Sequence, residues 1–296
     1  EMTSSLVGSE MCIRDSYLSL AHEALEHKAA FCFDADSEVG KAACYSLFSG
    51  GKRVRAVLCL AVCDMLGGNL QTAADYAAGI EMLHCYSLIH DDLPCMDDDD
   101  MRRGKPSCHK AFGEATALLA GDALLTAAFE AISTAPNASI EAVSVLSSAA
   151  GAKGMIYGQE LDLRFETQRA NAAQLETIHA NKTGKLIQAA VLLGACAAGA
   201  LTEDKALLRR YACDIGVVFQ IVDDILDVVS TSEVLGKPVG SDEENGKSTF
   251  VTLYGLDTSR RMAQEKTKNA CDALEGYGEK AWFLRELAVS LANRKQ

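Results

Sequence analysis

Proline and aromatic side chains are scarce in this sequence. Its 296 residues include four prolines and one tryptophan, and Phe, Trp and Tyr together make up 6% of the chain. Because proline breaks helices and aromatic residues favour strands, a chain with few of both is poorly suited to a strand-rich fold and well suited to long helices. Ala and Leu are abundant, and apolar residues recur at helical spacing almost throughout. The sequence therefore predicts an all-α protein.

Paired cysteines and excess positive charge are also lacking. The eleven cysteines show no short paired spacing such as CxxC, which argues against a disulfide framework or a zinc site and favours buried reduced thiols in a cytoplasmic protein. Lys and Arg number 28 against 41 Asp and Glu, a formal net charge of −13. We expect no nucleic-acid partner, because a phosphate backbone is bound by a basic face. An anionic substrate would need metal ions or local basic residues.

No apolar run is long enough to suggest a membrane span. The longest, 189–201, is shorter than the about 20 residues that a span needs, so we expect no membrane contact. Residues 1–16 have no sustained period or apolar run and carry acidic side chains, which argues against a signal peptide. We interpret them as a disordered or artefactual tail, translated from a cloning adapter, before a single domain over 17–296. A genomic sequence that keeps these codons in frame would contradict the adapter origin.

A dense acidic run is the most prominent feature of the chain. Residues 91–100, DDLPCMDDDD, carry six carboxylates. Apolar positions at helical spacing on both sides indicate that this run lies at the end of a core helix and is more than a solvated loop. Pro94 is expected to end that helix after Asp92 and to turn the chain back. Asp91 and Asp97 could then face the same cation.

A second acidic run, DDILD, begins at Asp223 within an apolar helix. Asp223 and Asp227 are four residues apart and share a face, with Gln220 one turn earlier and Asp224 adjacent. Carboxylates on apolar helices are costly unless they are paired or bind a metal ion. Oxygen ligands of this kind suit Mg²⁺, which is usually shared with substrate phosphates.

Several basic residues stand where an anion can bind. Gly50 and Gly51 allow a tight turn with exposed amides at a helix start, and NKTGK allows a kink or a new helix start. The polar segment 233–250 is interpreted as a loop over the second acidic run. The candidates at these places are Lys52, Arg55, Lys182, Thr183, Lys237 and Lys247. Taken alone, Lys52, Arg55 and Lys182 are explained equally well as solvated groups at a helix end. Gln159 and Asp162 are similarly either surface polar groups or outer support for a metal site.

These motifs together resemble a known family. The chain is similar to short-chain trans-isoprenyl diphosphate synthases, and most of all to bacterial farnesyl diphosphate synthases, in the ordered motifs GGKRVR, EMLHCYSLIHDDLPCMDDDDMRRGKPSCHKAFGEATALLAGDALL, GMIYGQELDL, NKTGKL, FQIVDDILDV and LGKPVGSDEENGKST. The likeness runs from about residue 17 to the C-terminus. It implies an orthogonal helical bundle around a deep central cavity, usually in a homodimer. It also implies head-to-tail condensation of isopentenyl diphosphate with an allylic diphosphate. Ala56 stands where the family often has Pro.

The resemblance assigns roles to individual residues. Asp91, Asp97 and Asp223 would bind Mg²⁺, in a cluster of about three ions. Asp92, Asp224 and Asp227 would complete the catalytic acidic groups. The residues expected to hold the allylic diphosphate are Arg102, Lys182, Thr183, Gln220, Lys237 and Lys247. Those expected to hold isopentenyl diphosphate are Lys52, Arg55, His84 and Arg103.

Product length is predicted from Tyr86 and its neighbour Ser87. Tyr86 lies five residues before Asp91, about 7.5 Å along the helix, where a side chain would close the pocket floor beneath a ten-carbon primer. In the family an aromatic residue here, with Pro94 and Cys95 as extra residues of the acidic motif, accompanies a fifteen-carbon product. The resemblance therefore favours farnesyl diphosphate. A geranylgeranyl diphosphate synthase and a catalytically silent subunit of a prenyl synthase are the alternatives.

Two other classes fit the sequence less well. An all-α metal phosphohydrolase could use His90 and Asp91, but that chemistry requires several histidine side chains close together. This assignment would also give the DDILD run no role. A terpene cyclase normally carries a mixed Asn, Ser and Glu second site where this chain has DDILD.

Overall fold

The computed structural model describes residues 2–166, 168–229 and 248–294. Over these residues the chain is all-α apart from one short two-stranded hairpin, which confirms the predicted fold class. The chain forms two compact units, unit 1 with Glu1–Leu146 and Leu193–Gly199, and unit 2 with Ser147–Leu192 and Ala200–Gln296. The chain passes from one unit to the other at three points. Two of these points lie inside helices, α7 (Ile140–Ala150) and α10 (Lys185–Ala197). For that reason no proline-rich or glycine-rich linker marks them in the sequence.

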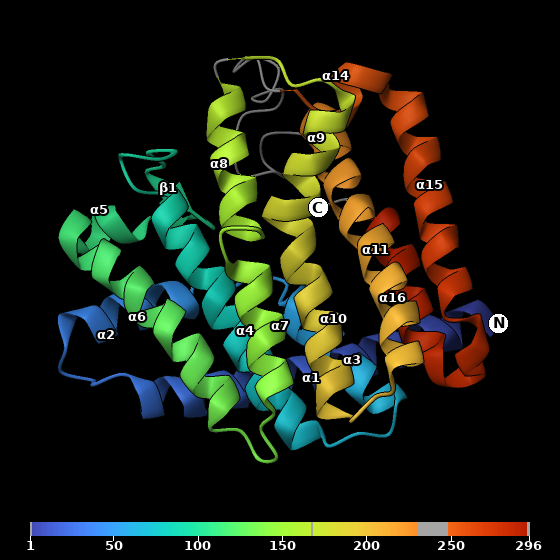
Figure 1. Ribbon diagram of the computed structural model, residues 1–296, viewed down its shortest axis with the longest axis horizontal. Helices are drawn as coiled ribbons and strands as arrows, with labels where there is room; N and C mark the ends of the chain where they lie inside the picture. The colour runs from blue at the N-terminus through green and yellow to red at the C-terminus, as the bar shows by residue number, and fades with distance from the viewer. Residues whose placement is uncertain (1, 167, 230–247, 295–296) are drawn as a thin grey trace. The chain divides into compact units, whose positions relative to one another are not determined.

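Unit 1 is built around α4 (Leu70–Asp91), which contacts α1, α2, α3 and α6 (Figure 1). Most residues of α4 are buried on every side, as expected for a central core helix. The other elements of unit 1 are α1 (Met2–Cys32), α2 (Glu38–Leu47), α3 (Val54–Met65), β1 (Met101–Arg102), β2 (Lys105–Pro106), α5 (Cys108–Phe112) and α6 (Glu114–Ser133).

Close packing between α4 and α6 depends on glycine. A Cβ atom added at Gly79 would lie 2.8 Å from the carbonyl oxygen of Ala128, and one added at Gly121 would lie 2.1 Å from the His90 ring. The two helices therefore approach where a side chain is missing. By length and composition alone, α6 is also long and apolar enough to cross a membrane, although Ala117, Ala120 and other residues of it are fully buried in unit 1. The absence of membrane contact stays a prediction.

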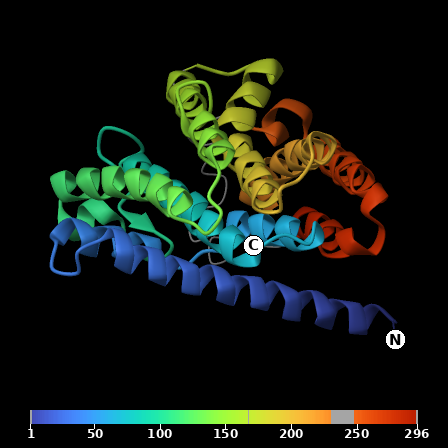
Figure 2. The same cartoon turned by 60° about the horizontal axis from the view of Figure 1, so that its bottom comes forward.

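Helix α1 is longer than the sequence indicated. An amphipathic helix is expected from Tyr17 to about Phe33, but the structure continues it back to Met2, through the residues expected to form a disordered tail (Figure 2). Extending an existing helix adds one hydrogen bond per residue without a new nucleation cost. A segment whose apolar residues show no sustained helical periodicity can therefore continue it. The adapter origin of this segment and the single-domain boundary remain predictions.

Unit 2 is built around α11 (Thr202–Val229), which contacts α15, α16, α14 and η1. Its core joins Val218, Ile221, Val222 and Ile225 of α11 to Leu175, Phe250 and Ala263. The other elements are α8 (Met155–Glu166), α9 (Ala172–His179), the π-helix η1 (Ala180–Gly184), α14 (Phe250–Tyr254), α15 (Leu256–Ala273), the 3₁₀-helix η2 (Glu275–Ala281) and α16 (Trp282–Ala292).

Candidate active site

The first acidic run turns back on itself as the sequence predicts. Helix α4 ends at Asp91, Asp92 is its C-cap, and the backbone N–H of Asp97 donates to the carbonyl oxygen of Asp91 at 2.9 Å. Both residues are half-buried. The doubling back at Pro94 is therefore confirmed, while the shared cation stays a prediction.

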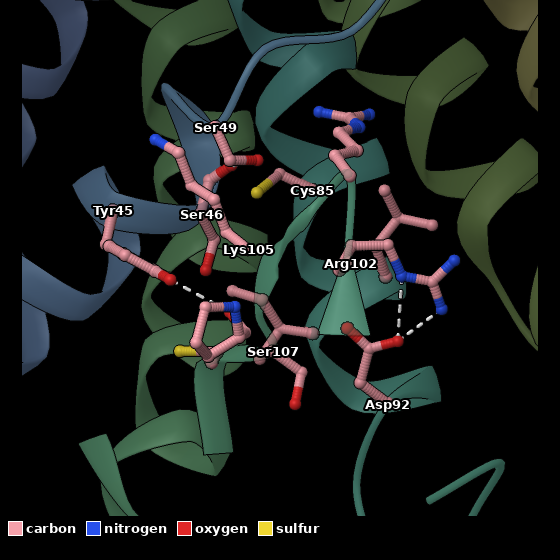
Figure 3. A pocket seen from close by; sticks show the side chains of 13 residues that line it. Tyr45, Ser46, Ser49, Cys85, Asp92, Arg102, Lys105 and Ser107 are labelled. Carbon is pink, nitrogen blue, oxygen red and sulfur yellow. Dashed lines mark hydrogen bonds and ion pairs between the residues drawn. The ribbon is translucent and has the colours of Figure 1, made fainter. Parts of the chain in front are cut away.

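Asp92 and Arg102 join this run to the hairpin of β1 and β2. The hairpin turn is Arg103–Gly104, with φ of 53° and 74°, the positive values that a type I′ turn requires. Arg102 Nε donates to the buried Asp92 carboxylate at 2.9 Å, and Nη2 contacts the same oxygen (Figure 3). Nη2 also donates to Asp99 Oδ2 at 3.1 Å. Burial raises the pKa of Asp92, against the opposing effect of the Arg102 hydrogen bond. Asp92 thus holds Arg102, a residue predicted to bind diphosphate, in place.

The glycine pair before Lys52 makes the expected turn, and Arg103 explains why glycine is needed there. Gly50 and Gly51 have φ of 95° and 118°. Arg103 Nη1 donates to the Gly50 carbonyl oxygen, and a Cβ atom on Gly51 would lie 2.8 Å from the Arg103 guanidinium carbon. Two motifs about 50 residues apart in the sequence therefore meet at this turn.

Glu81 and Arg53 anchor the same turn, and the sequence analysis missed both. Arg53 is the N-cap of α3 and donates to Glu81 Oε2 at 3.2 Å. The other oxygen of the buried Glu81 accepts the backbone N–H of Ala56 at 3.1 Å. A proline, frequent at that position in the family, has no N–H to donate. The only signal in the sequence was that Glu81 lies one helical turn before His84.

A cationic cluster forms around His84. Burial lowers the pKa of His84 well below its usual range, and the nearby charges of Arg55 and Arg103 lower it further. His84 is therefore neutral near pH 7, beside two permanent cations. Three of the four residues predicted to bind isopentenyl diphosphate are brought together in this way, and the fourth, Lys52, is exposed on the adjoining glycine turn.

Tyr86 and Ser87 lie on α4 between the cationic cluster and the acidic run. Tyr86 is buried, with its ring edge-on to His90 at 5.5 Å between centroids. The Ser87 hydroxyl donates to the carbonyl oxygen of His84 at 2.8 Å. Their effect on product length stays a prediction.

In unit 2 the kink or new helix start expected at NKTGK is a π-helical turn, η1, which leads into α10. Such turns occur often at functional sites because they redirect side chains. Here Lys182 Nζ donates to Asp162 Oδ2 at 2.5 Å, and the Thr183 hydroxyl donates to Gln220 Oε1 at 3.3 Å. His179, just before this turn, is stacked on Phe250, and its burial lowers its pKa to about 4.

The DDILD carboxylates differ in their surroundings. Asp224 is buried and accepts the backbone N–H of Phe250 at 2.7 Å and Nε2 of Gln220 at 3.2 Å, so it positions α14 against α11. Asp227 is also buried, whereas the Asp223 side chain is 44% exposed and paired with Arg294. The Arg294 guanidinium lies over the Phe219 ring and also donates to the Phe219 carbonyl oxygen at 2.8 Å. The sequence analysis did not identify Arg294 or its pairing with Asp223.

A pocket in unit 2 gathers residues from motifs that are far apart in the sequence. Its polar lining comes from GQELD, NKTGK, FQIVDD and KST, and its apolar lining from α8, α9 and the segment between them. The residues are Asp162, Phe165, Ala170, Leu175, Ile178, His179, Lys182, Thr183, Gln220, Asp224, Ser248 and Thr249. Lys237 and Lys247, also predicted to bind the allylic diphosphate, lie outside the described residues.

Gly158→Ala tests whether close packing of α8 positions Lys182. A Cβ atom at Gly158 would lie 2.1 Å from the backbone nitrogen of Lys182, so η1 must shift. Overpacking of this kind costs about 1–3 kcal/mol of unfolding free energy. We also expect weaker binding of inorganic diphosphate, measured by calorimetry beside urea unfolding.

Gly276→Ala is the matched control for this substitution. Nothing lies within 4 Å of a Cβ atom at Gly276, so we expect both its unfolding free energy and its diphosphate binding to match the unsubstituted protein. Equal stability and equal diphosphate binding in the two variants would refute the positioning role of Gly158.

Comparison with known proteins is consistent with this geometry. The family described as Polyprenyl synthetase matches residues 36–281. The chain is 44% identical to the farnesyl diphosphate synthase of Micrococcus luteus, over 91% of this chain and 93% of that protein. It is 47% identical to geranylgeranyl pyrophosphate synthase 11, chloroplastic, of Arabidopsis thaliana, over 84% of this chain and 73% of that one. A crystal structure of a geranyltransferase from Legionella pneumophila superposes with a TM-score of 0.86 at 37% identity, covering 97% of this chain and 98% of that chain.

These likenesses confirm the isoprenoid synthase type of all-α fold that the motifs implied. They also assign the chain prenyltransferase chemistry, the condensation carried out by trans-prenyl synthases in isoprenoid synthesis. The chain belongs to the polyprenyl synthetase family.

Proposed function

We propose that this protein condenses isopentenyl diphosphate with dimethylallyl diphosphate and then with geranyl diphosphate, to give farnesyl diphosphate. The pocket of unit 2 is the observation that carries this proposal. Lys182, Thr183 and Gln220 supply polar groups for a diphosphate, and they lie beside apolar residues such as Leu175 and Ile178. A pocket that is polar at one part and apolar at another suits an amphipathic substrate of this kind.

Mg²⁺ is the proposed cofactor, in a cluster of about three ions. The donors fit this metal, because Asp91 and Asp97 are half-buried on one turn and Asp223 keeps 44% of its side chain exposed. Carboxylate oxygens are the ligands that Mg²⁺ prefers. Bound metal would stabilise the negative charge that develops on the leaving diphosphate.

The protein's own residues would perform the remaining tasks. Lys182 and Thr183 would hold the allylic diphosphate, and a cation on its oxygens stabilises the ionising transition state more than the ground state. Isopentenyl diphosphate would be held by Lys52, Arg55, His84 and Arg103. Apolar walls would keep water from the allylic cation. After the alkene of isopentenyl diphosphate attacks this cation, a proton is lost, and we assign its acceptance to the departed diphosphate. A single side chain whose removal abolishes deprotonation would refute that assignment.

Product analysis tests the reaction directly. The protein is incubated with Mg²⁺, isopentenyl diphosphate and dimethylallyl diphosphate, with EDTA as the control, and the dephosphorylated alcohols are separated by length. Farnesol that disappears with EDTA is the expected result. Geranylgeraniol would support the second candidate, a geranylgeranyl diphosphate synthase, which the 47% identity to the Arabidopsis thaliana protein favours. The absence of any product would support the catalytically silent subunit.

Tyr86→Ala is expected to lengthen the product. Removing the buried ring opens space on α4 about 7.5 Å from the Asp91 position, enough for a longer chain. The measurement is the ratio of geranylgeraniol to farnesol under the same conditions.

Tyr86→Phe keeps the ring and serves as the control, with an unchanged product profile expected. If the Ala variant also gives the original profile, Tyr86 is only a core aromatic residue.

Two properties of the whole protein complete the proposal. We expect a homodimer, which light scattering of the purified protein would test, and a cytoplasmic location. The homodimer follows from the resemblance described above, and the cytoplasmic location from the eleven cysteines without paired spacing.

A further inference from the structure

A second group of possible metal ligands combines the end of the first acidic run with a histidine of α5. Asp98 and Asp100 follow the turn after α4, and His109 is the second residue of α5. One carboxylate oxygen of each aspartate and one ring nitrogen of His109 lie within 4.8 Å of one another. None of these residues has been assigned a role above.

The hairpin brings the three residues together. β1 pairs antiparallel with β2, and the N–H of Ser107 donates to the carbonyl oxygen of Asp100 at 2.9 Å, which extends the pairing by one step. His109, in the first turn of α5, therefore lies next to Asp100, although the two are nine positions apart in the sequence. The arrangement depends on this hairpin, which the sequence did not predict.

His109 supplies an independent sign of a ligand. Its side chain is only 3% exposed, and its buried Nε2 atom has no hydrogen-bond partner. Nε2 faces Asp98 Oδ1 at 3.8 Å, which is too long for a hydrogen bond. A buried polar atom without a partner costs about 1–3 kcal/mol, so native proteins rarely keep one without a reason.

The other ring nitrogen is fixed. Nδ1 of His109 lies 3.1 Å from the hydroxyl oxygen of the buried Ser107. When Nδ1–H donates to that oxygen, Nε2 carries its lone pair toward the two carboxylates. Metal-binding histidines are typically held in this way, with the second nitrogen donating to an oxygen.

A cation already approaches the two carboxylates. Lys110 Nζ lies 2.7 Å from Asp100 Oδ1 and 4.0 Å from Asp98 Oδ1. Lys110 is 42% exposed, and the aspartates are 60% and 73% exposed, so all three side chains can rearrange at small cost. Asp99 points elsewhere, because it pairs with Arg102. A metal ion would therefore compete with Lys110 for Asp98 and Asp100.

We propose that Asp98, Asp100 and His109 form a divalent transition-metal site, separate from the Mg²⁺ ligands Asp91 and Asp97. One imidazole and two carboxylates suit Zn²⁺, Co²⁺ or Mn²⁺ better than Mg²⁺, which prefers oxygen ligands alone. Three protein ligands leave a position for water. The bound ion links the segment that carries Asp97 to α5.

Co²⁺ titration of the full chain tests this site. Visible absorption is recorded without substrate, in a large excess of Mg²⁺ that fills the oxygen-only sites. We expect about one equivalent of Co²⁺ to bind, at least tenfold more weakly in His109→Gln, since losing an imidazole ligand removes the nitrogen donor. Lys110→Gln removes the competing ammonium, so it should bind Co²⁺ severalfold more tightly. Asp91→Asn is the matched control and should bind like the unsubstituted protein.

Two further results distinguish this site from other groups that could bind Co²⁺. Asp100→Asn changes an exposed side chain, so it decides the question if His109→Gln does not fold, as judged by circular dichroism. Co²⁺ bound by cysteine would show an intense near-ultraviolet thiolate band, and exposed Cys95 lies nearby in the sequence. Binding with that band, or binding unchanged in both His109→Gln and Asp100→Asn, would overturn the proposal. Because the readout is metal binding, it is independent of the proposed condensation.

Discussion

Replacing Asp97 by Asn is expected to lower kcat of the condensation by about 10²–10³-fold, the usual effect of removing one group that stabilises transition-state charge. Asn keeps the size of the side chain and loses the negative charge. The turn should survive, because it is the backbone N–H of residue 97 that donates to Asp91. We therefore expect kcat to fall and the apparent Mg²⁺ requirement to rise, while the thermal unfolding midpoint stays unchanged.

Asp99→Asn is the control, because it removes the same charge two residues away. Asp99 is about half exposed and contacts Arg102 at 3.1 Å, an interaction worth no more than about 1 kcal/mol. Its kcat should change by a few-fold at most. If both variants lose activity equally, the acidic run acts through its total charge, and a specific role for Asp97 is refuted.

Lys28→Met is expected to lower the free energy of unfolding by about 3–5 kcal/mol, the usual cost of leaving one member of a buried ion pair without its partner. Lys28 Nζ lies 2.9 Å from Asp75 Oδ2, with side chains 4% and 6% exposed, and it also donates to Thr134 Oγ1 at 3.1 Å. Met has a similar length and keeps the packing. Urea unfolding followed by circular dichroism measures the loss.

Lys41→Met is the matched control for this prediction. Lys41 pairs with Glu38 at 2.8 Å, but the two side chains are 48% and 69% exposed, so the expected cost is below about 1 kcal/mol. The double variant Lys28→Met with Asp75→Leu should recover much of the stability, because apolar residues often replace a buried pair without loss. Similar unfolding free energies for Lys28→Met and Lys41→Met would show that burial does not matter here.

Several side chains that are predicted to bind diphosphate or metal are paired with a side chain of opposite charge. Arg102 contacts Asp92, Lys182 contacts Asp162, and Arg294 contacts Asp223. A diphosphate or a metal ion at these groups would have to replace such a contact or share it. The pairings therefore affect the affinity for diphosphate or metal as well as the positions of the side chains. Breaking a charge pair costs free energy, which offsets part of the free energy of binding.

The site was only partly predictable from the sequence. The glycine turn at Gly50–Gly51, the helix end near Asp92 and the kink at NKTGK each depend on a few neighbouring residues, and the structure has all three. The hairpin at 101–106 was not predicted. Its strands are two residues long, and its turn begins with an arginine at positive φ, a conformation uncommon for that residue.

The sequence by itself determined the all-α class, the two acidic runs and the family. Periodicity, helix propensity and the placement of Pro and Gly act over a few residues, so they can be read without the fold. Tertiary structure alone decided which charges meet: Arg103 on the Gly50 turn, Glu81 on α3, Lys28 with Asp75, and His109 beside Asp98. Helix packing and the path of the connecting turns determine these contacts, and no local pattern shows which charged side chain will be buried against which partner.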